Sequence, residues 1–300
     1  MALLFLGIIY VTFISLGLPD SLLGVGWPEM YGELGVPQSY AGFLSMTISL
    51  GTIVASFFSG KWIRYAGTGK VTAFSVLGTA VALFGFYLAP SFLWLIVAAL
   101  PLGLGAGAVD AGLNDYVARH YQAHHMNWLH SFWGIGALAS PLIMGQILAN
   151  QQSWRIGYRL VSVIQFVVFL LLVVTLPMWR RRETRQAITQ IPVEIKETKF
   201  INMIRLKKVR YALYAFFFYI GVEATMGLWA SSYLIQAKGI NPAKAAIAYT
   251  GAIALPPLFG FLVPQVGIAV LPLFLMSYTV IMIVASEGLH RLLKNKNHRI

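Results

Sequence analysis

Long apolar segments dominate this sequence. A helix that crosses a membrane needs about 20 predominantly apolar residues, whereas barrel strands would alternate in polarity over about ten residues. The chain has 300 residues, 58% of them hydrophobic and only 11% charged, and a soluble domain of this length could not bury so much apolar surface. The sequence therefore predicts an all-α, polytopic membrane protein. The expected spans are 2–26, 39–60, 70–88, 92–118, 128–149, 157–178, 209–236, 243–263 and 266–286.

The positive charge is concentrated between two of these spans. The formal net charge is +12, and ten of the 22 lysines and arginines fall between positions 180 and 210. This pattern is typical of a cytoplasmic loop that meets anionic lipid headgroups. Nucleic-acid binding is not expected, because the stretch has no interleaved aromatic residues and no recognisable module. The absence of cysteine excludes disulfides, thiol catalysis and cysteine metal sites.

Loop charges predict the orientation of the first six spans. The stretch 27–38 carries two glutamates and no basic residue, so we expect it outside the cytoplasm. The turns at 61–70 and 119–125 are basic, and both should be cytoplasmic together with the N-terminus and the loop 179–208. Arg155 and Arg159 are a minor exception. Part of the loop 179–208 could be a short amphipathic helix on the membrane surface or a solvated linker.

The charge pattern breaks after residue 236. Three further spans would place the basic tail 287–300 outside the cytoplasm, against the positive-inside rule. An odd number of helices is therefore missing or extra in this part of the chain. The N-terminus lacks the basic region of a signal peptide, so the first segment is interpreted as a retained helix.

Three acidic residues lie inside the apolar segments: Asp20, Asp110 and Glu223. A carboxylate at the centre of a membrane helix costs roughly 3 kcal/mol on insertion scales, and such residues usually line a solute or ion pathway. Pro19 removes a helical hydrogen bond and predicts a kink or break beside Asp20.

Asp20 and Glu223 share a local pattern. Each is followed four residues later by glycine and then by tryptophan, which suits two related halves that each contribute their first helix to a central cavity. Chance similarity is the alternative explanation of the shared pattern. For either acid, the alternative is a neutral carboxyl that is hydrogen-bonded between helices.

Other polar residues accompany these acids. Asp110 and Asn114 are spaced i, i+4 and should share one helix face. His130 can donate or accept hydrogen bonds or carry protons, and the nearby Trp133 could line a cavity or anchor a helix end at the interface. The glycines at 103, 105 and 107 are interpreted as helix-packing positions rather than a dinucleotide-binding loop. Asp115 lies beside Arg119, nearer the cytoplasmic end of its span, and should be an interfacial residue rather than part of a cavity.

Four stretches resemble the major facilitator superfamily, and within it the fucose permease-like sugar:proton symporters. They are SLGLPDSLLGVGWPEMY, GAGAVDAGLNDYV, HSFWGIGALASPLI and FYIGVEATMGLWASSYL. The resemblance implies an alternating-access carrier with two six-helix halves around a midplane site. It places Asp20 at the family's first-helix acid and Asp110 at the fourth-helix acid linked to protonation and sugar binding. Asn114, His130 and Trp133 fall at other polar cavity positions.

The resemblance departs from the family near the end of the chain. The stretch AYTGAIALPPLFGFLVPQVGIAVLPLFLMSYTVIM looks like the family's last two helices, yet it directly follows KGINPAKAA, which looks like the exit of the seventh. About three helices of the second half are thus skipped, which would also explain the reversed charge of the tail.

These observations together predict a secondary active transporter in the cytoplasmic membrane. We expect a six-helix bundle (1–178), a basic cytoplasmic loop (179–208), an incomplete second bundle (209–286) and a basic tail (287–300). The function would be proton-coupled movement of a small polar solute, with sugars the favoured class. Asp110 would exchange the proton, and the solute would bind Asp20, Asn114, His130, Trp133 and Glu223. The expected partners are the solute, protons, the lipid bilayer and a possible second chain that completes the bundle; no cofactor or metal is expected. A non-transporting remnant, or a membrane-embedded enzyme, remains the alternative.

Overall fold

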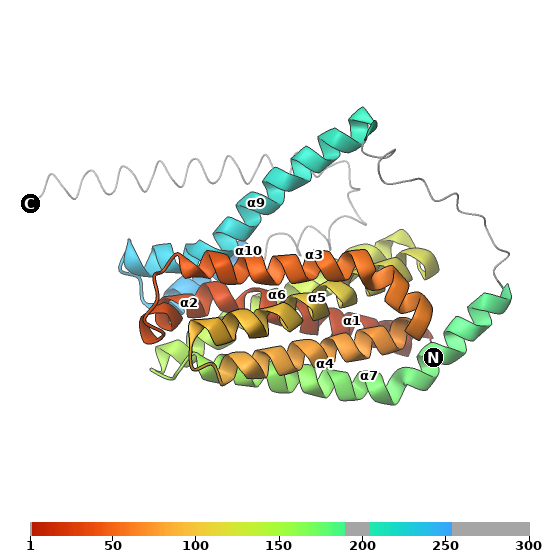
Figure 1. The fold of residues 1–300 in the computed structure, drawn as a ribbon, viewed down its shortest axis with the longest axis horizontal. Helices are drawn as coiled ribbons and strands as arrows, with labels where there is room; N and C mark the ends of the chain where they lie inside the picture. Colours follow the sequence, from red (N-terminus) through yellow and green to blue (C-terminus); the bar gives the residue numbers. More distant parts are fainter. Residues whose placement is uncertain (1, 190–204, 254–300) are drawn as a thin grey trace, which may run out of the picture.

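Helices account for almost all of the residues that the structure describes. The computed structural model describes residues 2–189 and 205–253 (Figure 1). The elements are α1 (Ala2–Asp20), α2 (Leu22–Glu33), α3 (Tyr40–Ala66), α4 (Thr68–Tyr87), α5 (Phe92–His120), α6 (Ala123–Ala149), α7 (Arg155–Thr189), α9 (Lys207–Gln236) and α10 (Pro242–Ile253). Six spans among these residues are long and apolar enough to cross a membrane, with α1 and α2 counted as one. The prediction of an all-α, multi-pass architecture is confirmed.

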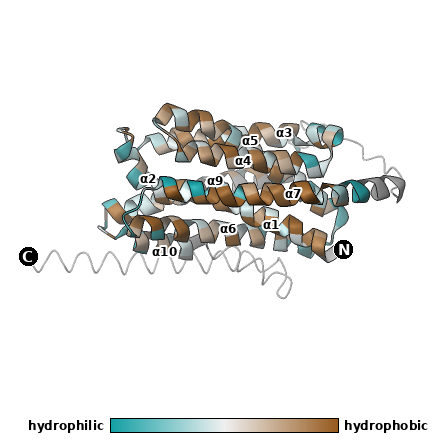
Figure 2. Cartoon of the chain, turned by 90° about the horizontal axis from the view of Figure 1, so that it is seen from below, coloured by the Kyte–Doolittle hydropathy of each residue, from teal (hydrophilic) through white to brown (hydrophobic). Residues whose placement is uncertain are grey.

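Hydrophobic residues run along the helices, and hydrophilic residues gather near their ends (Figure 2). Many large apolar side chains on the outer helices are exposed, among them Phe57 at 72% and Val174 at 77%. In water such exposed apolar surface would promote aggregation, whereas in a bilayer these side chains face lipid chains of the same polarity. The surface thus agrees with a membrane-embedded bundle.

The helix bounds follow the predicted spans, but several helices extend beyond them: α2 continues to Glu33 rather than ending at 26, and α3 continues to Ala66 rather than ending at 60. α6 begins at Ala123 rather than at 128, and α7 continues to Thr189 rather than ending at 178. The prediction stopped where the apolar run stopped, but arginine, glutamate and glutamine are good helix formers and extend α7 beyond it. The first part of the predicted loop 179–208 is therefore helical. Residues 190–204, the predicted ninth span and the predicted tail lie outside the described residues.

The first span is interrupted next to its proline, as predicted. α1 ends at Asp20 and α2 begins at Leu22. Pro19 has no N–H for the carbonyl of Ser15, four residues earlier. The side-chain amide of Gln165 in α7 donates to that carbonyl instead, at 2.5 Å. A neighbouring helix thus satisfies the backbone group that the proline leaves free, as buried polar groups in a membrane require.

Glycines set the closest helix contacts within residues 2–189. At the crossing of α1 and α6, a Cβ on Gly136 would collide with the backbone of Ile14 and Leu18. Where α3 crosses α5, Gly103 lies against the carbonyl of Ile48 and Gly107 against Thr52. Gly105 lies against α4, where a Cβ would be 2.6 Å from the carbonyl oxygen of Ser75. The interpretation of these glycines as packing positions is confirmed.

The helices α9 and α10 join this bundle at one end. α10 packs against α6, where Ala246 fills the space over Gly145, and Gly227 of α9 lies against Gly24 of α2. In Figure 1, α9 (teal) leans away from the bundle, so that its first half stands clear of the other helices. Accordingly Phe217 is 72% exposed and Phe218 is 68% exposed.

Candidate functional site

The break between α1 and α2 presents a carboxylate to α6. The indole Nε1 of Trp133 donates a hydrogen bond to Oδ2 of Asp20 at 2.8 Å. Asp20 is nevertheless exposed, whereas Trp133 is partly buried. The carboxylate therefore has one fixed donor and further lone pairs available to a solute.

A second carboxylate lies on α5. The amide Nδ2 of Asn114 donates to Oδ1 of Asp110 at 2.9 Å, which confirms that these two residues share a helix face. Both are half-buried. This amide leaves the other oxygen of Asp110 free for a proton or a solute.

Electrostatic contacts connect these residues. The charge of Asp20 interacts with those of Asp110 and Glu223, and the charge of Asp110 interacts with His130. His130 is exposed on α6, where its ring lies edge-on to Phe13 at 6.1 Å between centroids. The structure thus brings five of the six candidate residues into one polar region on α1, α5 and α6, and within the described part of the chain this region is open rather than sealed.

Glu223 approaches this region from α9 and is the outlier. Its side chain is exposed, and no hydrogen bond to it is seen among residues 2–189 and 205–253. Its charge reaches Asp20 and Tyr249 of α10, and the side chain of Tyr249 lies near Ser21 at the α1–α2 break. The second half of the described chain therefore contacts the break itself, through a tyrosine that sequence reasoning did not single out.

Gln165 is the other residue that the sequence analysis missed. It is buried in α7 and holds the carbonyl freed by Pro19, one helical turn from Asp20. The available signal was an amide side chain inside the most apolar span, together with a proline in another span that must leave one carbonyl without a donor.

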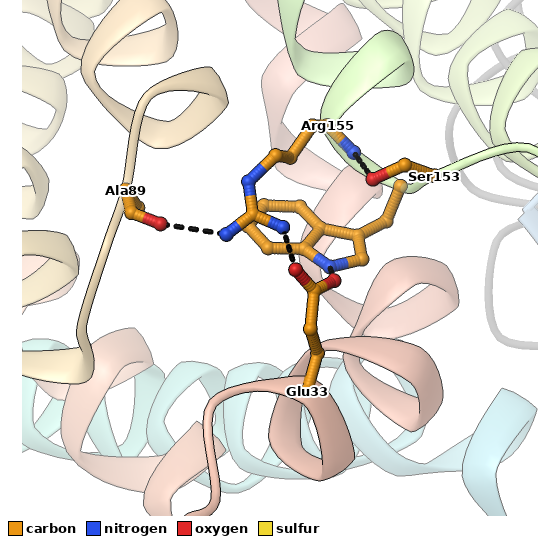
Figure 3. A network of polar contacts seen from close by, with 5 residues as sticks. Glu33, Ala89, Ser153 and Arg155 are labelled. Atoms are coloured by element: carbon orange, nitrogen blue, oxygen red, sulfur yellow. Dashed lines mark hydrogen bonds and ion pairs between the residues drawn. The ribbon is translucent and has the colours of Figure 1, made fainter.

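A separate polar network ties the bundle together at the end where α2 stops (Figure 3). Glu33 accepts hydrogen bonds from the guanidinium of Arg155 and, at 2.6 Å, from the indole of Trp154. Arg155 also donates to the carbonyl of Ala89 at 2.7 Å and lies 4.4 Å over the Trp154 ring. Arg155 and Arg159 were the two exceptions to the expected distribution of basic residues among the loops. Because Glu33 neutralises Arg155, this network accounts for one of them.

Two histidines in the first turn of α6, His124 and His125, pair with aromatic residues. His125 Nδ1 lies 2.9 Å from the hydroxyl of Tyr10, and the ring of His124 lies tilted beside that of His125, with 4.0 Å between the centroids. Within the described part of the chain, no group of three metal-ligating side chains is present. Asp115 forms an exposed i, i+4 ion pair with Arg119 at 2.7 Å, outside the polar region.

Comparisons with known proteins identify the family. The model of the Major Facilitator Superfamily matches residues 9–286, so the chain belongs to that superfamily. It is 23% identical over 253 residues to the glucose/mannose transporter GlcP of Bacillus subtilis, covering 82% of this chain and 60% of the relative. It is also 23% identical to the hexuronate transporter of that organism, covering 82% of this chain and 58% of the relative.

Two further comparisons concern another curated relative and the fold. The human sodium-dependent glucose transporter 1 is 22% identical, with 78% of this chain and 51% of the relative covered. A crystal structure of the peptide transporter POT in complex with sulfate superposes with a TM-score of 0.61 at 15% identity, over 87% of this chain and 68% of the other. The chain thus spans about 60% or less of the length of these curated relatives. The family assignment favours a transporter over an enzyme.

Proposed function

We propose that this chain carries a small polar solute across the cytoplasmic membrane by proton-coupled alternating access. The observation that carries the proposal is the open polar region, where Asp20 and Asp110 each keep a fixed amide or indole donor and interact with each other. Intramembrane acids of this kind serve as solute and proton sites. Membership of the superfamily supports the same class of activity.

Asp110 is assigned the coupling role. Its carboxylate interacts with both Asp20 and His130, so loading or releasing its proton changes the charge next to the solute. Asp20, Asn114, His130 and Trp133 would hydrogen-bond the solute, with Glu223 approaching from α9.

Sugars are the favoured solutes. Hydroxyl groups suit a mixture of carboxylate acceptors and amide, indole and imidazole donors, and an indole ring offers an apolar face to a sugar ring. Two relatives are named as transporters of glucose/mannose and of hexuronate, which supports this class.

Uptake into proteoliposomes tests the coupling role. We expect Asp110→Asn to abolish accumulation driven by a proton gradient while leaving downhill exchange of the same sugar, because an amide cannot release a proton. Asp115→Asn on the same helix is the matched control and should transport normally, since Asp115 is exposed and pairs with Arg119 outside the polar region. Unchanged uphill uptake by Asp110→Asn would remove this residue from the mechanism.

A chain that binds solute without moving it is the second candidate. It is favoured by the exposure of Asp20 and His130 among residues 2–189 and 205–253, and by the way α9 leans away from the bundle. A second chain that covers the polar region would restore transport. Solute binding to the purified protein without exchange in proteoliposomes would select this candidate.

The N-terminus and the loop 179–208 are proposed to face the cytoplasm. The chain has no cysteine, so single cysteines can report the orientation in intact cells. Tyr65→Cys lies in the α3–α4 region and is 95% exposed, and it should be protected from an impermeant thiol reagent. Gln38→Cys, in the turn between α2 and α3, should react. The reverse pattern would invert the proposed orientation.

A further inference from the structure

An apolar groove runs along the outer surface of α3, α4 and α5. It encloses about 380 Å³ and is lined mainly by apolar side chains and glycines. Its walls include Trp62, Phe74, Gly78, Pro101 and Leu104. Trp62 is 41% exposed and Phe74 is 65% exposed, so the groove opens away from the bundle, toward the surrounding lipid.

A single charged side chain lines this groove. Lys70 lies in the first turn of α4, and no acidic residue is among the lining residues. Lys70 also has no ion pair within the described part of the chain. From Lys70 to Gly78 the groove follows α4 for about 12 Å, at 1.5 Å of rise per residue. It therefore combines a cationic mouth at the helix end with an apolar channel directed toward the membrane interior.

We propose that this groove is a binding site for one anionic phospholipid of the bilayer. The phosphate would lie on the ammonium group of Lys70, and one acyl chain would lie along α4 between Phe74 and Leu104. The last turns of α3 carry Lys61 and Arg64 as well, which suits the leaflet that is rich in anionic lipids.

The choice of lipid rests on the lysine rather than on the apolar walls. Acyl chains of any phospholipid are as apolar as the groove, so filling it gives no preference between headgroups. A lysine near the surface favours an anionic headgroup by an amount that corresponds to about a fivefold change in affinity. The groove contributes by holding the acyl chain in a position that places the headgroup at Lys70.

The glycines show that the channel has room for a chain. A Cβ built on Gly78 would find only the carbonyl oxygen of Pro101, at 3.9 Å, which is ordinary contact. Gly105, by contrast, lies so close to α4 that a side chain there would strike the backbone of Ser75. A side chain added at 78 can therefore fill the groove without separating the helices, whereas one added at 105 would separate them.

The test measures lipid binding to the purified full chain by native mass spectrometry. Phosphatidylglycerol and phosphatidylcholine with identical acyl chains are titrated separately. We expect phosphatidylglycerol to bind more tightly, Lys70→Gln to weaken it about fivefold, and Lys70→Arg to retain it. Gly78→Leu, which fills the channel, should abolish the preference for phosphatidylglycerol.

Matched controls separate this site from general surface charge. Lys61→Gln removes a nearby exposed lysine that lies 5.6 Å over the Phe58 ring and is not part of the groove, and it should leave binding unchanged. An equal loss with Lys61→Gln, or unchanged binding in Gly78→Leu, would overturn the proposal. Displacement of the lipid by equimolar glycerol phosphate would also overturn the proposal, since the acyl chain would then contribute nothing to binding.

Discussion

Two regions of this molecule are built from similar apolar helices but are held in different ways. In the bundle of α1 to α7, glycines at helix crossings let backbones touch, so that neighbouring helices fix one another along much of their length. α9 meets the bundle through its second half, where Gly227 lies against Gly24 and Gln236 donates to the hydroxyl of Tyr31 at 3.2 Å, and the aromatic residues of its first half are exposed. Apolar composition is therefore enough to place a helix in a membrane, whereas packing needs small residues at the right positions.

The polar side chains differ in the same way. Asp20 and Asp110 each receive a hydrogen bond from another side chain of the bundle, whereas Glu223 of α9 reaches the polar region through its charge alone. The first region thus holds its acids in place, and the second brings an acid near them. Substitutions that are matched between the two regions test whether this difference is real.

Two glycine substitutions should show the largest difference. Gly136→Leu places a side chain against the backbone of Ile14 and Leu18, so α1 and α6 must separate. We expect a loss of about 3 kcal/mol in stability, the upper end of overpacking costs. Gly221→Leu in α9 meets nothing within 4 Å and should change stability by less than about 0.5 kcal/mol. Thermal unfolding in detergent, followed by tryptophan fluorescence, measures both. Similar shifts would show that α9 packs as tightly as the bundle.

The two acids should differ in solute binding. Asp20→Asn removes the charge from a carboxylate that Trp133 holds in place, and hydrogen bonds to charged groups contribute about 1.5–3 kcal/mol. We therefore expect roughly 10-fold to 100-fold weaker binding of the transported sugar. Glu223→Gln should weaken it less than about threefold, because this exposed side chain has no fixed partner on the described bundle.

Equilibrium binding to the purified protein compares these variants. Trp133→Phe is the matched test of how Asp20 is positioned, because it keeps an aromatic ring and removes only the donor. It should weaken binding less than Asp20→Asn does. A larger effect of Glu223→Gln than of Asp20→Asn would place the principal solute contact on α9 and reverse the assignment.

Sequence reasoning predicted the parts of the fold that depend on local features. Apolar run length located the first six spans, Pro19 located the helix break, and the i, i+4 spacing placed Asp110 beside Asn114. Each depends on a few neighbouring residues, whose geometry the helix repeat determines. The predicted end of the sixth span, at 178, fell short of the end of α7 at Thr189, because the last turns of α7 are held by helix propensity rather than by membrane burial.

Contacts between distant segments could not be predicted in this way. Gln165 meets Ser15 and Trp133 meets Asp20 across different helices, and a single sequence does not say which spans are neighbours. The charge pattern suggested that Glu33 and Arg155 face the same side of the membrane, but not that they touch. The roles of the six candidate residues remain predictions that the binding and uptake measurements test.

The smallest of the expected differences concerns two cations, one in each region. Arg155 joins Glu33, the Ala89 carbonyl and the Trp154 ring, and its side chain is 24% exposed while that of Glu33 is 47% exposed. Because solvent screens this network in part, Arg155→Ala should cost about 1–2 kcal/mol of stability. Lys238→Ala removes a cation 5.6 Å from the ring of Tyr233, which is 54% exposed, and should cost less than about 0.5 kcal/mol.

The geometry of Arg155 makes this prediction sharper than a test of charge alone. A planar guanidinium reaches Glu33 and Ala89 at once while it stacks on Trp154, and an ammonium cannot do all three. Arg155→Lys should therefore recover less than half of the loss caused by Arg155→Ala. A double-mutant cycle with Glu33→Gln should give a coupling of about 1 kcal/mol. Full recovery by lysine, or a coupling near zero, would mean that the bundle is held at this end by helix packing alone.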